Sequence, residues 1–313
     1  MSNRVVNAEK KEDVPNSFVP NSLLSVRNLT VKRKSKTLLD AVSFKVLQGE
    51  YLTIIGANGA GKSTLLKCLD NILTGWTGEI LFEGLPIRKI GQRKLARRIA
   101  YVQQMVPVFF TFTVRQRVEM GRYPHLQPFS PISETDREIV ETSMRSMGIL
   151  HLADRFVETL SGGEKQKVQL AAALAQQTDV LCLDEPTTYL DYKHQHEISQ
   201  WLRTFNREQG KTIIEVTHDV NRAVLSGTHV LALNSGKVVF DGKPELLMTQ
   251  EHLHTIYDID FQLADHPVLP LRVVLPEMPP EVLPEVPPNR FPLPDKIHQE
   301  NGIDQDKAIN GQS

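Results

Sequence analysis

Apolar and polar residues alternate along the first part of the chain, and the period then changes. The stretches LLSVRNLTV (23–31) and 38–46 alternate in the way that strands of a half-buried antiparallel sheet do. A short apolar run, YLTIIG (51–56), ends at a glycine, and GKSTLLKCLDNIL (61–73) then repeats at helical period. This order of strand, turn and helix predicts the start of an α/β unit.

The rest of the chain also alternates between the two periods. Residues 78–84 and 97–104 predict strands, and the pattern from about 107 to 160 is mostly helical, with Ser133 and Asp136 forming an S-x-x-D helix start. Further strands are expected at 180–184, 211–218, 229–234 and 237–240. Strands that alternate with helices imply a mostly parallel sheet with right-handed crossovers. The helical block, about 105–165, is interpreted as an insertion.

Composition sets limits on this picture. Of 313 residues, 40% are hydrophobic, which is enough for a core, and a net charge of −1 argues against a nucleic-acid partner. No run approaches 18 consecutive apolar residues, so the chain is expected to reach a membrane only through a partner. Residues 1–22 are expected to form a flexible tail, and 256–313 a proline-rich, partly disordered extension. Residues 23–255 remain for the main domain.

The segment GANGAGKST (56–64) follows the strand predicted at 51–56 and opens the helix. It fits the pattern G-x-x-x-x-G-K-[ST], whose glycines let the backbone wrap a polyphosphate so that successive N–H groups face its oxygens. The following helix adds its positive end to that cradle. Lys62 supplies a charge for the β- and γ-phosphates, and the Ser63 hydroxyl suits Mg²⁺. The predicted nucleotide-binding residues of this loop are Gly56, Ala57, Asn58, Gly59, Ala60, Gly61, Lys62, Ser63 and Thr64.

Two carboxylates end the strand expected at 180–184. Asp184 is placed to face Mg²⁺, because a hard cation prefers oxygen ligands. Glu185 is placed to accept a proton from an attacking water, which is the role of a general base. Acidic residues also commonly end strands at helix starts, but the phosphate-binding loop upstream favours catalysis.

The segment LSGGE (160–164) distinguishes among the classes of protein that share this loop. Ser161, Gly162 and Gly163 open a predicted helix and would form a second anion-binding helix end. The segment resembles the signature of ABC transporter ATPases, and the resemblance covers about residues 23–255. It implies an α/β fold of the P-loop NTPases (RecA-like) with an antiparallel β subdomain and a helical subdomain. Two phosphate-binding devices serve one ATP only if two copies meet head to tail. The residues expected to act on the partner's ATP are Ser161, Gly162, Gly163 and Glu164.

The same resemblance implies roles for three further residues. Gln104 matches the Q-loop glutamine, which senses Mg²⁺ and the γ-phosphate. Asp191 matches the D-loop aspartate, which acts across the dimer, and His218 matches the switch histidine, which contacts the γ-phosphate. The expected catalytic residues are therefore Glu185, His218 and Gln104, and the expected Mg²⁺ ligands are Ser63, Gln104 and Asp184.

Two positions depart from the family pattern. Arg33 stands where the family usually has an aromatic residue that stacks on adenine, and its guanidinium plane is expected to stack there more weakly. Ala172 stands where the family usually has arginine, which is expected to remove a contact on the helix surface.

Three segments narrow the transporter class: GRYPHL (121–126), TTYLDYKHQHEI (187–198) and THDVNRA (217–223). They resemble the ATPases of iron-siderophore, haem and vitamin B12 importers, although zinc and manganese importers share many of these features. A soluble ABC ATPase without a transport role is a further alternative, and so is a regulatory role centred on the proline-rich extension. The resemblance implies ATP and Mg²⁺, a second copy of the chain, a polytopic permease and, indirectly, an extracytoplasmic substrate-binding protein. It places the chain at the cytoplasmic face of the membrane, with residues 108–112 as the expected permease-docking surface.

Overall fold

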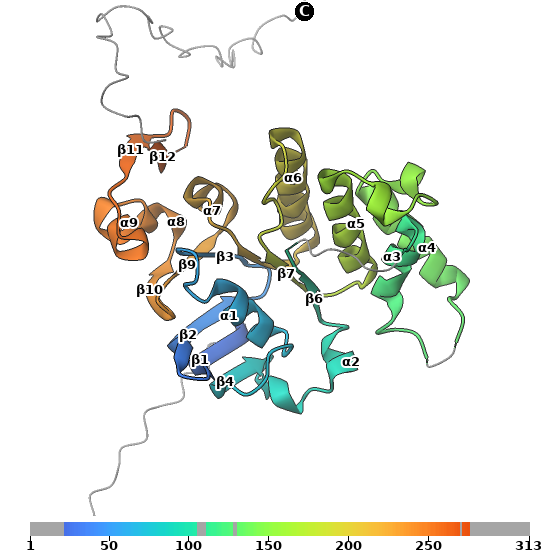
Figure 1. Ribbon diagram of the computed structural model, residues 1–313, viewed down its shortest axis with the longest axis horizontal. Coiled ribbons are helices and arrows are strands. Elements are labelled where there is room, and N and C mark those ends of the chain that lie inside the picture. Colours follow the sequence, from blue (N-terminus) through green and yellow to red (C-terminus); the bar gives the residue numbers. More distant parts are fainter. Residues whose placement is uncertain (1–21, 105–110, 128–129, 270, 276–313) are drawn as a thin grey trace, which may run out of the picture. The chain divides into compact units, whose positions relative to one another are not determined.

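The computed structural model describes residues 22–104, 111–127, 130–269 and 271–275. Within these residues a six-stranded sheet has the order β10–β9–β3–β8–β7–β6 (Figure 1). Neighbouring strands are parallel except β10, which runs antiparallel to β9. The bounds are β3 Tyr51–Ile55, β6 Ile99–Val102, β7 Val180–Asp184, β8 Thr212–Val216, β9 His229–Asn234 and β10 Lys237–Gly242.

The central strands are covered on both faces. Every residue of β3, β7 and β8 is buried, as in a parallel sheet that lies between two layers. Alternate residues face opposite layers: Cys182 and Ile214 join the core beneath α1 (Lys62–Leu69), whereas Leu183 and Ile213 join the core beneath α5 (Gly162–Ala175) and α6 (Tyr192–Gln209). The continuous apolar runs in the sequence arise from this double burial.

An antiparallel sheet of order β2–β1–β4–β5 covers α1 from the outside. Its strands are β1 Ser22–Arg33, β2 Lys36–Leu47, β4 Thr77–Phe82 and β5 Leu85–Pro86, and the short helices η1 Ile87–Lys89 and α2 Gln92–Leu95 follow it. The alternation predicted for 23–31 and 38–46 is confirmed, because the apolar residues of β1 and β2 point into one core with α1.

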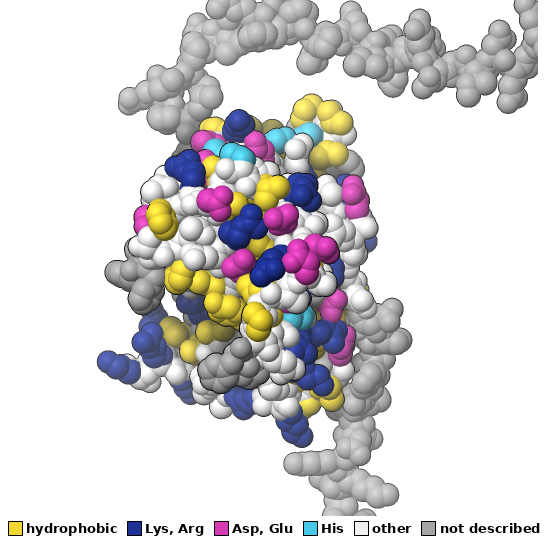
Figure 2. Space-filling view, turned by 90° about the vertical axis from the view of Figure 1, so that its right-hand side faces the viewer, with side chains coloured by type: hydrophobic (Ala, Val, Ile, Leu, Met, Phe, Trp, Pro, Cys, Tyr) yellow, Lys and Arg dark blue, Asp and Glu magenta, His cyan; other side chains and the backbone are white. Residues whose placement is uncertain are grey.

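Residues 105–110, which include 108–110 of the expected permease-docking surface, lie outside the described part of the chain, and the first described helix of the helical subdomain is α3. Figure 1 shows α3, α4 and α5 grouped beyond β6, away from α8 and α9. The predicted start at Ser133 is confirmed by a capping box, in which Ser133 and Asp136 bond to each other's backbone N–H groups. Figure 2 shows acidic and basic side chains intermixed on this side of the molecule. The subdomain contains α3 Val114–Glu119, η2 Met120–Arg122, α4 Glu134–Ser146, η3 Leu150–Leu152, η4 Val157–Thr159 and α5.

The compact unit continues past the boundary expected at residue 255 and ends at Leu275. After α7 Val220–Ser226, α8 Pro244–Leu247 and α9 Gln250–Tyr257, the chain forms a hairpin of β11 Gln262–Asp265 and β12 Arg272–Leu275. Asn221 explains this difference, because its amide donates to the Val274 carbonyl (2.8 Å) and accepts from the Val274 N–H (2.7 Å). The tail 1–21 and the proline-rich part from 276 onward lie outside the described residues.

None of the helices in the described ranges combines the length and apolar character that a membrane span requires. The α/β prediction with its antiparallel and helical subdomains is confirmed.

Candidate active site

The site lies where neighbouring parallel strands end. The P-loop (56–64) follows β3, Gln104 follows β6, Glu185 follows β7 and His218 follows β8. These four strands are neighbours in the order β3–β8–β7–β6, so their carboxyl ends meet at one edge of the sheet. That edge is the usual ligand-binding edge of an open α/β sheet.

The P-loop requires its glycines at both ends. Gly56 has φ 145°, and a Cβ there would lie 2.1 Å from the Leu233 carbonyl oxygen. Gly61 has φ 105°, and a Cβ there would lie 2.7 Å from the carbonyl oxygen of Leu38. A side chain at either position would therefore force the loop open. Around them Asn58 and Gly59 are exposed at the tip, Ala60 is buried, and Ala57 and Thr64 are half-buried.

Lys62, the first residue of α1, lies over this loop. Its Nζ donates to the carbonyl oxygens of Gly56 (2.8 Å) and Ala57 (3.0 Å). Burial lowers the pKa of Lys62, while Glu185 and Asp184 act in the opposite direction. The ammonium group is thus held by the loop carbonyls, within electrostatic reach of both carboxylates, where it could match a phosphate charge.

Ser63 and Asp184 form a pair of oxygen donors. The Ser63 hydroxyl donates to Asp184 Oδ1 at 2.8 Å, and the Tyr101 hydroxyl donates to Asp184 Oδ2 at 3.0 Å. Burial and the Asp184 carboxylate raise the pKa of Tyr101, which keeps it a donor. A hydroxyl beside a carboxylate is a donor set that suits a hard divalent cation such as Mg²⁺. Motif reasoning missed Tyr101, which pairs with Cys182 across β6 and β7.

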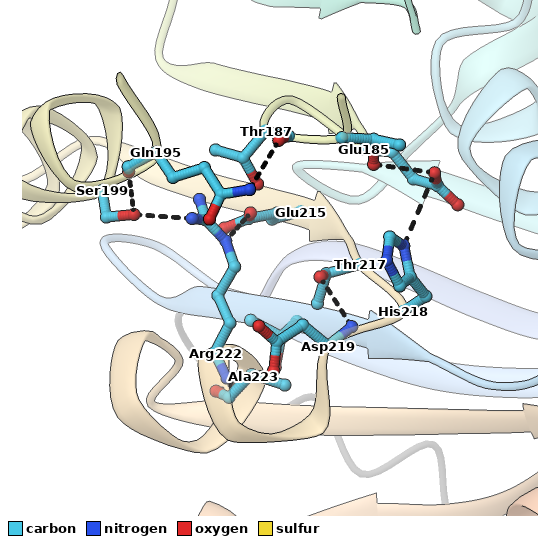
Figure 3. Close-up of polar contacts among 12 residues, drawn as sticks. Glu185, Thr187, Gln195, Ser199, Glu215, Thr217, His218, Asp219, Arg222 and Ala223 are labelled. Carbon is cyan, nitrogen blue, oxygen red and sulfur yellow. Dashed lines mark hydrogen bonds and ion pairs between the residues drawn. The ribbon is translucent and has the colours of Figure 1, made fainter. Parts of the chain in front are cut away.

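Glu185 lies at the centre of the predicted catalytic residues. Its Oε2 accepts from Gln104 Nε2 (3.2 Å) and from Thr188 Oγ1 (3.0 Å), and His218 Nδ1 lies 3.7 Å away. Figure 3 shows the carboxylate and the imidazole pointing toward each other. The Glu185 backbone has a φ of 50°, a conformation that costs energy in a residue with a side chain. The structure therefore brings Gln104, Glu185 and His218 together; Thr188 was not predicted.

The signature residues begin a different helix. Ser161 caps α5 by accepting from the Glu164 N–H (3.3 Å), and the Glu164 carboxylate accepts from the Ser161 N–H (2.8 Å). This bond lowers the pKa of Glu164. Gly162 and Gly163 form the first turn of α5 in the helical subdomain, whereas the P-loop opens α1 in the α/β core.

Asp191 caps α6 and is exposed. The segment before Asp191 is hydrogen-bonded to the first turns of α6. Gln195 Nε2 donates to the carbonyl oxygens of Thr187 (3.3 Å) and Leu190 (2.9 Å) (Figure 3). Ser199 donates to the Gln195 carbonyl at 2.6 Å and accepts from Arg222 Nη1 at 2.6 Å. A continuous set of hydrogen bonds therefore joins the D-loop to α7, the helix that follows His218.

Arg33 and Ala172, the two residues that depart from the family pattern, lie in different parts of the fold. Arg33 is exposed at the end of β1, in the hairpin whose Leu39 side chain lies against Gly61. Ala172 is buried in α5, and a Cβ on Gly121 would lie 2.1 Å from its carbonyl oxygen. The backbone of η2, which contains Gly121, therefore lies close to the backbone of α5 at Ala172.

Four features together define an ATP-binding cassette. They are a P-loop after β3, a histidine after the neighbouring strand β8, a pair of carboxylates at the end of the next strand β7, and a second glycine-rich helix start at α5. Comparison with known sequences agrees: residues 39–188 match the family described as ABC transporter. The chain is 38% identical over 248 residues to the ferric enterobactin transport ATP-binding protein FepC of Escherichia coli, covering 79% of this chain and 92% of that protein. It is 38% identical over 258 residues to the hemin import ATP-binding protein HmuV of Nocardia farcinica, covering 81% and 88%.

Solved structures agree with the sequence comparison. A structure assigned to the metal-chelate type of ABC transporter, in an inward-facing conformation, superposes with a TM-score of 0.73 at 27% identity, covering 84% of this chain and 100% of that chain. A bacterial ABC transporter cassette solved as a dimer superposes with a TM-score of 0.63 at 27% identity, covering 71% and 98%. The chain belongs to the ATP-binding proteins of ABC transporters, and it is an ATPase.

Proposed function

We propose that this chain is the ATP-hydrolysing subunit of an importer that takes up a metal chelate, namely an iron-siderophore, haem or cobalamin. The single observation that supports the enzymatic part most strongly is the Glu185 carboxylate, which has Gln104 at 3.2 Å and His218 at 3.7 Å. The metal-chelate part rests on relatives that are named for ferric enterobactin, iron(3+)-hydroxamate, hemin and cobalamin.

In this proposal the P-loop binds the phosphates of ATP. Its N–H groups and the first turn of α1 face the phosphate oxygens, and Lys62 Nζ exchanges its loop carbonyl partners for phosphate oxygens. Arg33 stacks on the adenine beside the loop. Ser63 and Asp184, whose oxygens lie 2.8 Å apart, would hold Mg²⁺ together with Gln104. When bound, Mg²⁺ neutralises charge on the β- and γ-phosphates.

Glu185 acts as the general base. Its carboxylate orients a water and accepts a proton from it as the water oxygen bonds to the γ-phosphorus and the bond to the β–γ bridging oxygen breaks, which releases ADP and phosphate. Gln104 and Thr188 donate to one carboxylate oxygen, which fixes the orientation of the side chain. His218 is 57% exposed, so its free edge is available to a phosphate oxygen.

The second copy of the chain completes each site. Ser161, Gly162 and Gly163 lie in the helical subdomain, at a different helix start from the P-loop, and act on the nucleotide bound to the partner. Asp191 lies exposed and acts across the same interface. The structural likeness to a cassette solved as a dimer supports this arrangement.

The chain serves the membrane from the cytoplasmic face, bound to polytopic permease subunits. An extracytoplasmic substrate-binding protein delivers the chelate on the other side. The cargo contacts those partners and not the ATPase, so this chain supplies energy but not selectivity.

An uptake experiment tests the proposed cargo. A strain that lacks this chain is complemented with the wild-type chain or with Glu185→Gln and is supplied with radiolabelled ferric siderophores, haem or cobalamin. We expect uptake of one of these chelates to be restored by the wild-type chain and not by Glu185→Gln. Loss of zinc or manganese uptake instead, or no transport defect at all, would contradict the proposed cargo.

A further inference from the structure

Gly163, in the first turn of α5, lies against the ring of His194, in the first turn of α6. A Cβ on Gly163 would lie 2.5 Å from both Cγ and Cδ2 of His194 and 2.8 Å from its Nδ1. Gly163 does not have a positive φ. Alanine is a better helix former than glycine by about 1 kcal/mol, so the backbone does not require glycine here. Glycine is required here because the His194 ring occupies the space that a side chain at residue 163 would need.

The same ring is bonded to the D-loop aspartate. His194 Nδ1 lies 2.8 Å and 3.0 Å from the two carboxylate oxygens of Asp191, and the His194 backbone N–H donates to Asp191 Oδ1 at 2.8 Å. The His194 side chain is 24% exposed, so it is held by these contacts on most sides. One side chain therefore contacts both the signature turn and the D-loop of the same subunit.

This contact joins two parts of the fold. Gly163 begins α5 of the helical subdomain, while α6 follows β7 of the central sheet. We propose that His194 is a positioning residue that sets the spacing between the signature turn and Asp191. The inference rests on the proposed function, in which both elements act on the partner's nucleotide. A fixed spacing lets the two elements meet one nucleotide together, and errors of about 1 Å in such positions can cost about a hundredfold in rate.

The chain offers a matched control on the same two helices. Lys167 of α5 and Glu197 of α6 form an ion pair at 2.5 Å, about one helical turn beyond Gly163 and His194. Glu197→Gln weakens the packing of α5 against α6 but leaves the signature turn and Asp191 untouched. If His194 only packs α5 against α6, its substitution should have the same small effects as Glu197→Gln.

ATP-driven dimerisation of Glu185→Gln provides the first test. Adding His194→Ala should raise the dimer dissociation constant in ATP about tenfold or more, while the Kd for ADP stays within about twofold. Adding Glu197→Gln should change the dimer constant by less than about threefold. His194→Asn, whose amide nitrogen can take the place of Nδ1, should recover most of the loss.

Turnover gives the second test. In the otherwise wild-type chain, Gly163→Ala should lower kcat, and combining it with His194→Ala should cost less than the product of the two single losses, because the clash is removed. Losses that multiply independently would contradict the proposed contact.

The inference is overturned if His194→Ala behaves like Glu197→Gln in both tests. If Glu185→Gln alone does not dimerise with ATP, the proposed head-to-tail function fails. If Glu185→Gln dimerises equally well with and without His194→Ala, only the positioning role of His194 fails.

Discussion

At the scale of single residues, His229 lies between two carboxylates on neighbouring segments. Its Nδ1 lies 2.9 Å from Glu50 Oε1, and its Nε2 lies 2.5 Å from Asp241 Oδ1. Both nitrogens can donate only when the ring is protonated. The hydrogen bond to Asp241 and the ion pair with Glu50 accordingly raise the pKa of His229 to about 9.

This pair of contacts predicts a pH dependence of stability. The pKa in the folded state exceeds the unfolded value of about 6.5, so the stabilisation is complete below that pH and is lost as the pH rises through about 9. The free energy of unfolding should fall by about 3 kcal/mol over this range. Urea unfolding of the wild type and of His229→Gln at several pH values checks this. If the free energy of unfolding changes with pH equally in both proteins, the prediction is contradicted.

Some residues of the site could be predicted from sequence motifs, and others could not. Gln104, Glu185 and His218 were identifiable because each follows an apolar strand within a recognisable motif. Tyr101 and Thr188 were not, because their hydroxyls reach Asp184 and Glu185 only through side-chain directions that the tertiary fold determines. The contact of His194 with Gly163 has the same origin, since the two residues lie on different helices.

At the scale of elements, one buried network joins β3, β8, α6 and α7. Glu215 is 0% exposed; it accepts from Arg222 Nε at 2.8 Å and from the Tyr51 hydroxyl. Arg222 also donates to Ser199 on α6. Since Arg222 is only 10% exposed, the ion pair sits where an unpaired charge would be costly.

Replacing Arg222 with an uncharged residue should therefore destabilise the fold strongly. Arg222→Met leaves the Glu215 carboxylate buried and unpaired, which should cost about 3–5 kcal/mol in the free energy of unfolding. Arg137→Met is the matched control, because Arg137 pairs with Glu134 at the surface with 57% and 76% exposure and should cost less than about 1 kcal/mol. Comparable losses in urea unfolding would show that the network does not have this role.

The strands themselves were largely predictable, for a physical reason. β7 and β9 coincide with the predicted 180–184 and 229–234, because apolar runs of this length between polar ends fit a strand covered on both faces. The β11–β12 hairpin was not predicted. Its pairing with Asn221 and the packing of Leu263 depend on α7, which is remote in sequence.

At the scale of the whole molecule, the proposed site needs two copies of the chain. Each chain has a phosphate-binding loop on α1 and a glycine-rich helix start on α5, in different subdomains. We propose that ATP binding closes two chains around two nucleotides and that hydrolysis by Glu185 releases them. Closure would thus use the binding energy of ATP, and hydrolysis would reset the pair.

Light scattering of Glu185→Gln, first with ATP and then with ADP, shows from the solution mass whether ATP brings two chains together. Removing the proposed general base should block hydrolysis, so we expect twice the mass of the single chain in ATP, with one nucleotide per chain, and the single-chain mass in ADP. A single-chain mass with ATP bound would contradict closure of two chains around ATP, and ordinary ATP turnover by this variant would contradict the proposed role of Glu185.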